Sequence, residues 1–229
     1  MRNDIVLIFS GGLDSSTLLY YLRSGGFPVR ALSINYGQRH QRELHAAEVI
    51  ARRAGVEHKI ADLTALRPLM AGSSQTSDDI AVPEGHYAEE TMRQTVVPNR
   101  NSLMLAVAVA WAQSIEARTV AYAAHSGDHF IYWDCRPDFI RALRGVYALA
   151  EPYPVALRAP FEAWNKAAIA RAAHDLGVPI AETYSCYKNG PVQCGRCGTC
   201  YERREAFTMA GVHDPTPYLD TTVVFKEPL

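Results

Sequence analysis

Short apolar runs alternate with amphipathic stretches along most of this chain. Residues 4–8 are almost wholly apolar, which is typical of a parallel strand buried on both faces. Residues 18–23 (Leu-Leu-Tyr-Tyr-Leu-Arg) have the composition of a helix. The alternation continues, with strands predicted at 29–35, 58–63, 119–123 and 155–157, and helices at 41–54, 102–113, 138–149 and 165–176. It predicts an α/β fold, with a parallel, twisted sheet and helices on both faces.

One long segment breaks this rhythm. Residues 67–93 are rich in Gly, Pro and Ser and show little periodicity. Long irregular segments inside compact domains are usually functional loops or disordered chain. The segment is predicted to be a mobile flap, with plain disorder as the alternative.

Composition and charge narrow the class of protein. Hydrophobic residues make up 48% of the 229 positions, which is enough for a packed core. The charges nearly cancel, with 23 Lys and Arg against 24 Asp and Glu, so direct nucleic-acid binding is not expected. The chain shows no apolar run that could span a bilayer and no signal peptide at its N-terminus. We expect a cytoplasmic protein that does not contact the membrane.

The most informative stretch lies between the first predicted strand and the first predicted helix. It reads Ser-Gly-Gly-Leu-Asp-Ser at residues 10–15. Adjacent glycines let backbone N–H groups approach a phosphate, a helix N-terminus adds its positive dipole, and hydroxyls donate further hydrogen bonds. It is neither a Walker loop nor a dinucleotide fingerprint, because no Gly-Lys-Ser/Thr follows and the glycines are contiguous. A phosphate-binding loop is favoured over an ordinary glycine turn.

Four of the five cysteines form a C-x7-C-x2-C-x2-C cluster, at Cys186, Cys194, Cys197 and Cys200. In a reducing compartment such a cluster indicates a metal site rather than disulfides. Four thiolates complete a tetrahedral zinc ion and leave no open position, as in a structural site. An iron–sulfur cluster accepts the same ligands, but nothing else in the sequence suggests electron transfer. Zinc is therefore favoured, and its role is to hold the C-terminal end against the domain.

The fifth cysteine, Cys135, stands apart from this cluster. It lies near His125 and His129 in the sequence and could be a nucleophile. A lone cysteine is more often a small buried residue, and that interpretation is favoured. The two histidines have H-x3-H spacing, but the Gly between them favours a loop over a metal-binding helix.

Taken together, these segments resemble a known family. The loop at residues 10–15 matches the signature of the PP-loop ATP pyrophosphatases, which cleave ATP to AMP and pyrophosphate. Residues 35–40 (Asn-Tyr-Gly-Gln-Arg-His), 97–101 (Val-Pro-Asn-Arg-Asn) and 132–137 (Tyr-Trp-Asp-Cys-Arg-Pro), with the cysteine cluster, look like the 7-cyano-7-deazaguanine synthase (QueC) family. The resemblance runs from about residue 5 to residue 210. It implies the adenine nucleotide alpha hydrolase-like (PP-loop) fold, with a C-terminal zinc-binding segment.

The resemblance also implies a reaction, an ATP-dependent carbon–nitrogen ligation in queuosine and deazaguanine biosynthesis. The family converts 7-carboxy-7-deazaguanine and ammonia to 7-cyano-7-deazaguanine (preQ0), using ATP, Mg2+ and Zn2+. ATP activates the carboxylate as an adenylate, ammonia gives an amide, and a second activation permits loss of water to the nitrile. The alternative within the family is an enzyme that couples the activated deazaguanine to a protein amine in an antiphage system. A homodimer is also implied.

Site residues follow from matching this chemistry to the motifs. The phosphate loop and its flanks are expected to bind ATP, with further nucleotide contacts after the second strand: Phe9, Ser10, Gly11, Gly12, Leu13, Asp14, Ser15, Ser16, Thr17, Leu18, Leu19, Asn35, Tyr36 and Arg39. The expected catalytic residues are Asp14, Arg100 and Lys166, which orient the loop or carry Mg2+ and neutralise developing negative charge. The expected substrate contacts are Asn99, Asp128, Tyr132, Asp134 and Arg136. Tyr132 or Trp133 is expected to stack on the base, with simple packing as the alternative.

Two other classes of protein share parts of this pattern. A tRNA sulfur-inserting PP-loop enzyme usually needs a reactive cysteine pair, and only Cys135 stays outside the cluster. A non-enzymatic zinc-ribbon module is disfavoured by the intact loop. The chain is predicted to comprise a PP-loop domain, residues 1–183, and a zinc-binding segment, residues 184–229, packed on that domain.

Overall fold

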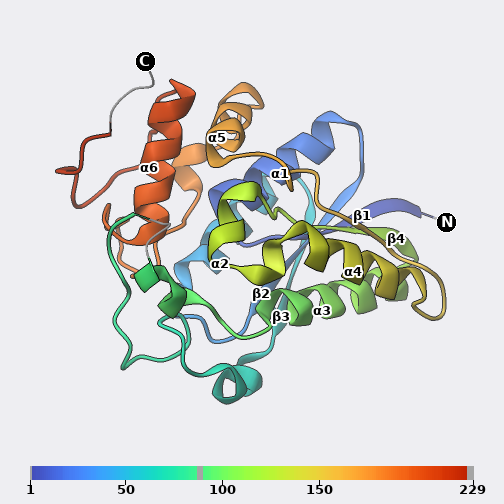
Figure 1. Ribbon diagram of the computed structural model, residues 1–229. Helices are drawn as coiled ribbons and strands as arrows, with labels where there is room; N and C mark the ends of the chain where they lie inside the picture. The colour runs from blue at the N-terminus through green and yellow to red at the C-terminus, as the bar shows by residue number, and fades with distance from the viewer. Residues whose placement is uncertain (1, 87–89, 226–229) are drawn as a thin grey trace.

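Five parallel strands form the centre of the protein (Figure 1). The computed structural model describes residues 2–86 and 90–225. The strands are β1 Arg2–Ile8, β2 Val29–Asn35, β3 Glu57–Asp62, β4 Ala117–Ala121 and β5 Ala156–Arg158. They are hydrogen-bonded in the order β3-β2-β1-β4-β5, and every neighbouring pair is parallel. The predicted parallel sheet is confirmed.

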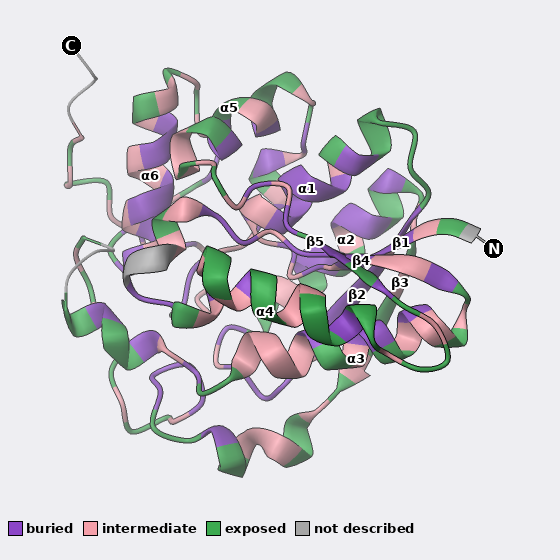
Figure 2. Ribbon diagram, turned by 45° about the vertical axis from the view of Figure 1, so that its right-hand side comes forward, coloured by how far each residue is buried: buried purple, intermediate pink, exposed green. Residues whose placement is uncertain are grey.

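Helices cover both faces of this sheet. Alternate side chains of β1 lie on opposite faces of the sheet, because Ile5 and Leu7 pack with one helical layer and Val6 packs with the other. One layer holds α1 Leu13–Ser24, α2 Arg42–Ala54, α5 Lys166–Asp175 and α6 Gly198–Ala210, and the other holds α3 Arg100–Ser114 and α4 Pro137–Ala148. Figure 2 shows the buried residues gathered where these helices meet the sheet. The predicted α/β architecture therefore rests on two separate hydrophobic cores.

The order of the strands creates a crevice at one edge of the sheet. The chain builds β2 and β3 on one side of β1 and then returns to build β4 and β5 on the other. The connections that leave β1 and β4 therefore run to opposite sides, and ligands bind at such a switch point, beyond the carboxyl ends of the strands. The loop at residues 10–15 leaves β1 at this position.

Two segments differ from the sequence-based prediction. Helix α6 was not predicted, although it packs against α5 and contributes Ala206 and Phe207 to the core. The segment 67–93 is irregular, as predicted, but residues 73–76 at its centre are buried, and residues 87–89 lie outside the described part. Because the centre of this segment packs against the protein, plain disorder does not describe it. The mobility of the segment stays a prediction. No helix in the described ranges is long and apolar enough to cross a membrane.

A close backbone approach fixes the phosphate loop against α2. Gly11 has φ +79°, and a Cβ there would lie 2.4 Å from the Ala47 nitrogen and 2.6 Å from the Glu43 carbonyl oxygen. The Gly11 carbonyl also accepts a hydrogen bond of 3.0 Å from the Tyr184 N–H. Only glycine satisfies both the backbone angle and the contact.

We predict that Gly11→Ala lowers the free energy of unfolding by about 3 kcal/mol or more, because the new methyl group meets rigid backbone. The matched control is Gly26→Ala, which has φ +78° and no atom within 4 Å of the added Cβ. The free energy of unfolding of this control should fall by only about 1–2 kcal/mol, the cost of the left-handed backbone for a residue with a Cβ. Urea unfolding measures both, and equal losses would contradict the steric explanation.

Candidate active site

A cavity of about 220 Å³ lies at the carboxyl ends of β1 and β4. Its walls come from the phosphate loop, the segment after β4, the start of α3, the start of α5, and the C-terminal segment from Tyr184 to Arg203. This is the crevice that the strand order creates. The structure therefore brings segments from both ends of the chain around one cavity.

The phosphate loop is held in shape by its own side chains. The Ser15 hydroxyl accepts a hydrogen bond of 3.2 Å from the Ser10 N–H and lies 3.1 Å from the Ser10 hydroxyl. The Ser10 hydroxyl in turn accepts from the Gly12 N–H at 3.3 Å. The Ser16 hydroxyl is buried without a hydrogen-bond partner in the protein. Such a loop presents donors in a fixed arrangement to an anion.

The predicted nucleotide residues divide into two groups. Ser10, Gly12, Leu13, Asp14, Ser15 and Tyr36 line the cavity. Most of the others shape the loop or the core around it, while Asn35 and Arg39 bond other parts of the backbone. Phe9, Leu18 and Leu19 are fully buried in the core, and the Thr17 hydroxyl donates to the Leu13 carbonyl at 2.8 Å.

Lys166 joins two carboxylates from distant parts of the chain. Its ammonium nitrogen lies 2.7 Å from Asp14 Oδ2 and 3.1 Å from Glu202 Oε2. Burial alone would lower the pKa of Lys166, but attraction by these carboxylates outweighs it, and the pKa lies above its usual range. Burial would raise the pKa of Asp14, but Lys166 and His125 outweigh that effect, and the pKa lies below its usual value. Asp14 is thus held ionised beside the loop.

His125 is buried next to the carboxylates of Asp14 and Asp128. Its Nδ1 accepts a hydrogen bond of 3.1 Å from the Gly127 N–H, so the other ring nitrogen carries the proton when the ring is neutral. Nε2 lies 3.4 Å from Asp128 Oδ2 and 3.7 Å from Asp14 Oδ2. Asp14 Oδ1 is buried and has no hydrogen-bond partner in the protein. The free oxygen is a candidate ligand for a hard cation.

The far end of the cavity is aromatic. Arg100 lies 5.7 Å from the ring centre of Tyr132, whose hydroxyl is 2.6 Å from Thr95 Oγ1 and 3.2 Å from the Tyr187 hydroxyl. Burial raises the pKa of Tyr36 to about 12, so this phenol stays neutral. Such a surface suits a flat heterocycle.

Cys135 also borders this end of the cavity. It is buried, and its sulfur accepts a hydrogen bond of 3.2 Å from the Asn101 side chain. Burial raises the pKa of the Cys135 thiol well above its usual range. A thiol held in its neutral form is a poor nucleophile, which supports the packing interpretation.

Several residues predicted to contact ligand do not line the cavity. Arg39 donates to the carbonyls of Ser77 and Ile80 at 2.8 and 3.0 Å and so fastens the irregular segment. Arg136 lies over the ring of Trp133 at 4.7 Å, and that ring is 66% exposed. Two others bond the local backbone, since Asn35 accepts from the Gly37 N–H and Asp134 accepts from the Asn101 N–H. Asn99 occupies the N-cap position of α3 with φ 53° and makes no side-chain cap hydrogen bond. Asp128 and Tyr132, in contrast, line the cavity.

The structure adds residues that the sequence did not single out. Glu202 and Thr199 reach the cavity from α6, and Tyr184, Ser185 and Tyr187 reach it from the segment before the helix. All five lie between the clustered cysteines or within two residues of them in the sequence. That position is the one signal that could have found them.

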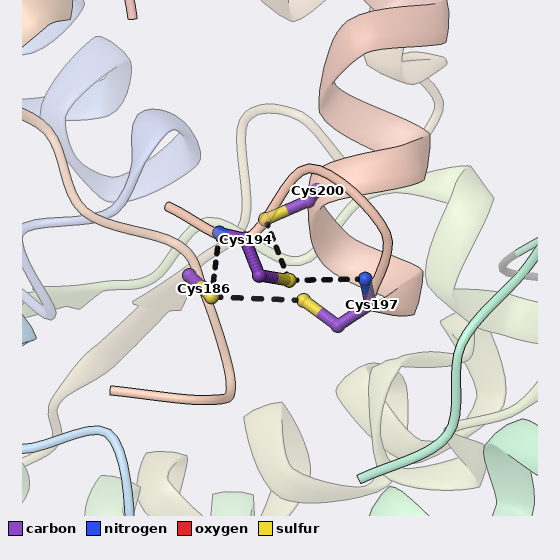
Figure 3. A group of neighbouring side chains, drawn as sticks. All are labelled: Cys186, Cys194, Cys197 and Cys200. Carbon is purple, nitrogen blue, oxygen red and sulfur yellow. Dashed lines mark hydrogen bonds between the residues drawn. The ribbon is translucent and has the colours of Figure 1, made fainter. Parts of the chain in front are cut away.

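The four clustered cysteines converge on one point (Figure 3). Their sulfur atoms all lie within 4.8 Å of one another, with Cys194 to Cys200 and Cys186 to Cys197 both at 3.9 Å. Tetrahedral zinc with Zn–S bonds of about 2.3 Å requires sulfur atoms about 3.8 Å apart. Hydrogen bonds from neighbouring thiols and from the Cys197 N–H lower the pKa of Cys194, which favours the thiolate that binds metal. The cluster fits a closed, structural zinc site.

Comparison with known proteins now identifies the family. Residues 4–211 match the family model described as "Queuosine biosynthesis protein QueC". The chain belongs to the QueC family. A 7-cyano-7-deazaguanine synthase of Marinobacter nauticus is 49% identical over 218 residues, which cover 95% of this chain and 98% of that protein. One of Brucella anthropi is 51% identical over 217 residues, covering 94% of this chain and 93% of that protein.

The fold is shared more widely than the family. The crystal structure of a 4-thiouridine synthetase in complex with RNA and bound ATP aligns with a TM-score of 0.51 at 14% identity. The alignment covers 77% of this QueC chain and 41% of that protein. The predicted PP-loop fold is confirmed.

We predict that Cys194→Ser removes bound zinc and lowers the free energy of unfolding by about 3 kcal/mol or more, because the closed site loses a ligand. Cys135→Ser is the matched control, since Cys135 lies outside the cluster, and its zinc content should stay unchanged. Metal analysis and thermal unfolding check both variants. Full zinc content in Cys194→Ser would contradict the assignment.

We predict that Lys166→Met destabilises the protein by about 3 kcal/mol at pH 8 and by less at pH 5. In the native chain the lowered pKa of Asp14 stabilises the fold above the usual value of 3.8, and this stabilisation is lost as the pH falls through the lowered pKa. Without Lys166, burial raises that pKa instead, so protonation at lower pH relieves the unpaired carboxylate.

Urea unfolding at the two pH values measures the effect. The control Lys59→Met removes an exposed ammonium 3.7 Å from Glu57 and should cost well under about 1 kcal/mol at either pH. An equal loss at both pH values for Lys166→Met would contradict the role given to Lys166.

Proposed function

We propose that this chain converts 7-carboxy-7-deazaguanine and ammonia to 7-cyano-7-deazaguanine at the expense of ATP. The single observation that carries the proposal is the match to QueC relatives over almost their whole length. The cavity supports it, because a phosphate loop and an aromatic, cationic wall face the same space. No observation favours transfer of the deazaguanine to a protein amine.

The chemistry needs a carboxylate to become an acceptor for ammonia. A carboxylate repels nucleophiles, and oxide is a poor leaving group. The carboxylate oxygen attacks the α-phosphorus of ATP, which forms an acyl adenylate and releases pyrophosphate. Ammonia then displaces AMP and loses a proton, giving the amide. A second ATP adenylates the amide oxygen and releases pyrophosphate. The nitrogen then loses its two protons and AMP leaves with the oxygen, so that the nitrile forms with the net loss of water.

The residues of the cavity match these steps. Ser10, Gly12 and Ser15 hold the phosphates, and Lys166 stabilises the charge that develops as pyrophosphate leaves. Mg2+ would be carried by Asp14 through its unpartnered oxygen and, when bound, would neutralise phosphate charge. Asp128 accepts hydrogen bonds from the base, and Tyr132 forms part of the aromatic wall.

Two expectations about the assembled protein stay predictions. The homodimer rests on the family resemblance alone, and the cytoplasmic location rests on the sequence pattern alone. We also propose the division into a domain at residues 1–183 and a zinc-binding segment at 184–229. It describes the organisation of the sequence and not two separate sites, because the segment supplies part of the cavity wall.

We predict that purified protein, given the acid, ATP and 15N-ammonium, forms labelled nitrile together with AMP and pyrophosphate. Asp14→Asn should reduce this turnover by about 100-fold or more, because the loop loses its carboxylate, while Lys166 keeps its ion pair with Glu202. Mass spectrometry follows the acid, the amide and the nitrile. Pyrophosphate release that does not depend on the acid would contradict the proposal.

A further inference from the structure

Arg100 differs from the other cations of the cavity, because the protein gives it no counter-ion. Lys166 lies 2.7 Å from an Asp14 oxygen, and Arg203 lies 3.4 Å from an Asp214 oxygen. No ion pair among the described residues includes Arg100, where an ion pair means a nitrogen and a carboxylate oxygen within 4.0 Å. A charge buried in a protein is costly unless it is paired.

Most of the groups around Arg100 carry no charge. Its neighbours include the phenols of Tyr36, Tyr132 and Tyr187. The Asp134 carboxylate attracts Arg100 electrostatically and helps to raise its pKa, but lies beyond ion-pair distance. The pKa of Tyr36, about 12, keeps that hydroxyl protonated at neutral pH, and the raised pKa of Cys135 keeps the thiol protonated. The guanidinium therefore faces mainly neutral groups, and Asp134 does not contact it directly. An anion in the cavity would be its direct counter-ion.

Two anions are available in the proposed reaction, the triphosphate of ATP and the carboxylate of the acid. The triphosphate already has the phosphate loop and Lys166, which come from the helical layer of α1 and α5. Arg100 comes from the first turn of α3, in the opposite layer. Its tyrosine neighbours suit a flat aromatic acid better than a hydrated phosphate chain. The position favours the carboxylate.

We propose that Arg100 binds the carboxylate of 7-carboxy-7-deazaguanine and thereby selects the acid over the neutral nitrile. The guanidinium offers two parallel N–H donors to a carboxylate, and the tyrosines exclude water from the pair. Conversion to the nitrile removes the charge and leaves Arg100 unpaired again, which weakens product binding. This inference rests on the proposed function and names the residue that reads the substrate's charge.

The test compares binding of the acid and of the nitrile in the presence of a non-hydrolysable ATP analogue. We expect Arg100→Met to weaken binding of the acid by about 10- to 100-fold and to leave the nitrile and the ATP analogue little changed. Arg100→Lys should restore part of the affinity for the acid. Arg141→Met, which removes an exposed arginine paired with Asp138, is the control and should change neither ligand.

Thermal unfolding without ligand separates this role from a structural one. Arg100 is half-buried and has no ion pair, so its removal should leave the melting temperature unchanged or raise it. Arg203→Met instead breaks the pair of a buried arginine with Asp214 and should lower the melting temperature by several degrees. A loss in Arg100→Met as large as that in Arg203→Met would overturn the inference. So would weaker binding of the ATP analogue with unchanged binding of the acid.

The two proposals fail in different ways. If the native chain binds no acid, the proposed function is wrong and this inference with it. If the native chain binds the acid and Arg100→Met binds it equally well, the function stands and only the role of Arg100 is lost.

Discussion

A buried ammonium held between carboxylates organises this protein. Lys166, at the start of α5, contacts Asp14 from the loop after the first strand and Glu202 from the last helix. These charges are largely withdrawn from water, and removing one partner of a buried pair costs about 3–5 kcal/mol because the other charge is left uncompensated. These ion pairs therefore hold the first loop, α5 and α6 next to one another. Both the ion pairs and the sheet shape the cavity.

The C-terminal segment is part of the site rather than an attachment to it. The cysteines hold a turn of the C-terminal segment (Figure 3). Residues next to or between these cysteines, Ser185, Tyr187 and Thr199, line the cavity. One further turn of α6 places Glu202 beside Lys166, and Arg203 anchors the same helix to Asp214 and Thr183. A closed zinc site does no chemistry of its own. Here the cysteine cluster shapes one wall of the cavity and, through α6, positions the charge of Glu202.

Much of this could be predicted from the sequence where local signals are strong. The apolar runs gave the strands nearly to the residue, as at Val29–Asn35, and the phosphate loop and the cysteine spacing indicated their sites. Helix α6 was not predicted because its charged residues Glu202 and Arg203 face the interior, so the helix lacks the usual amphipathic pattern. The hydrogen-bond partners of Arg39 could not be predicted either, because these carbonyls lie about forty residues away in an irregular segment.

The central claim is that one cavity binds the triphosphate and the acid side by side, at the carboxyl ends of β1 and β4. A crystal structure with the acid and a non-hydrolysable ATP analogue tests it most directly. The account predicts phosphates on the N–H groups of the Ser10–Ser15 loop, with the carboxylate between the α-phosphate and Arg100. Phosphates bound elsewhere, or a base placed outside the wall formed by Tyr36 and Tyr132, would contradict it.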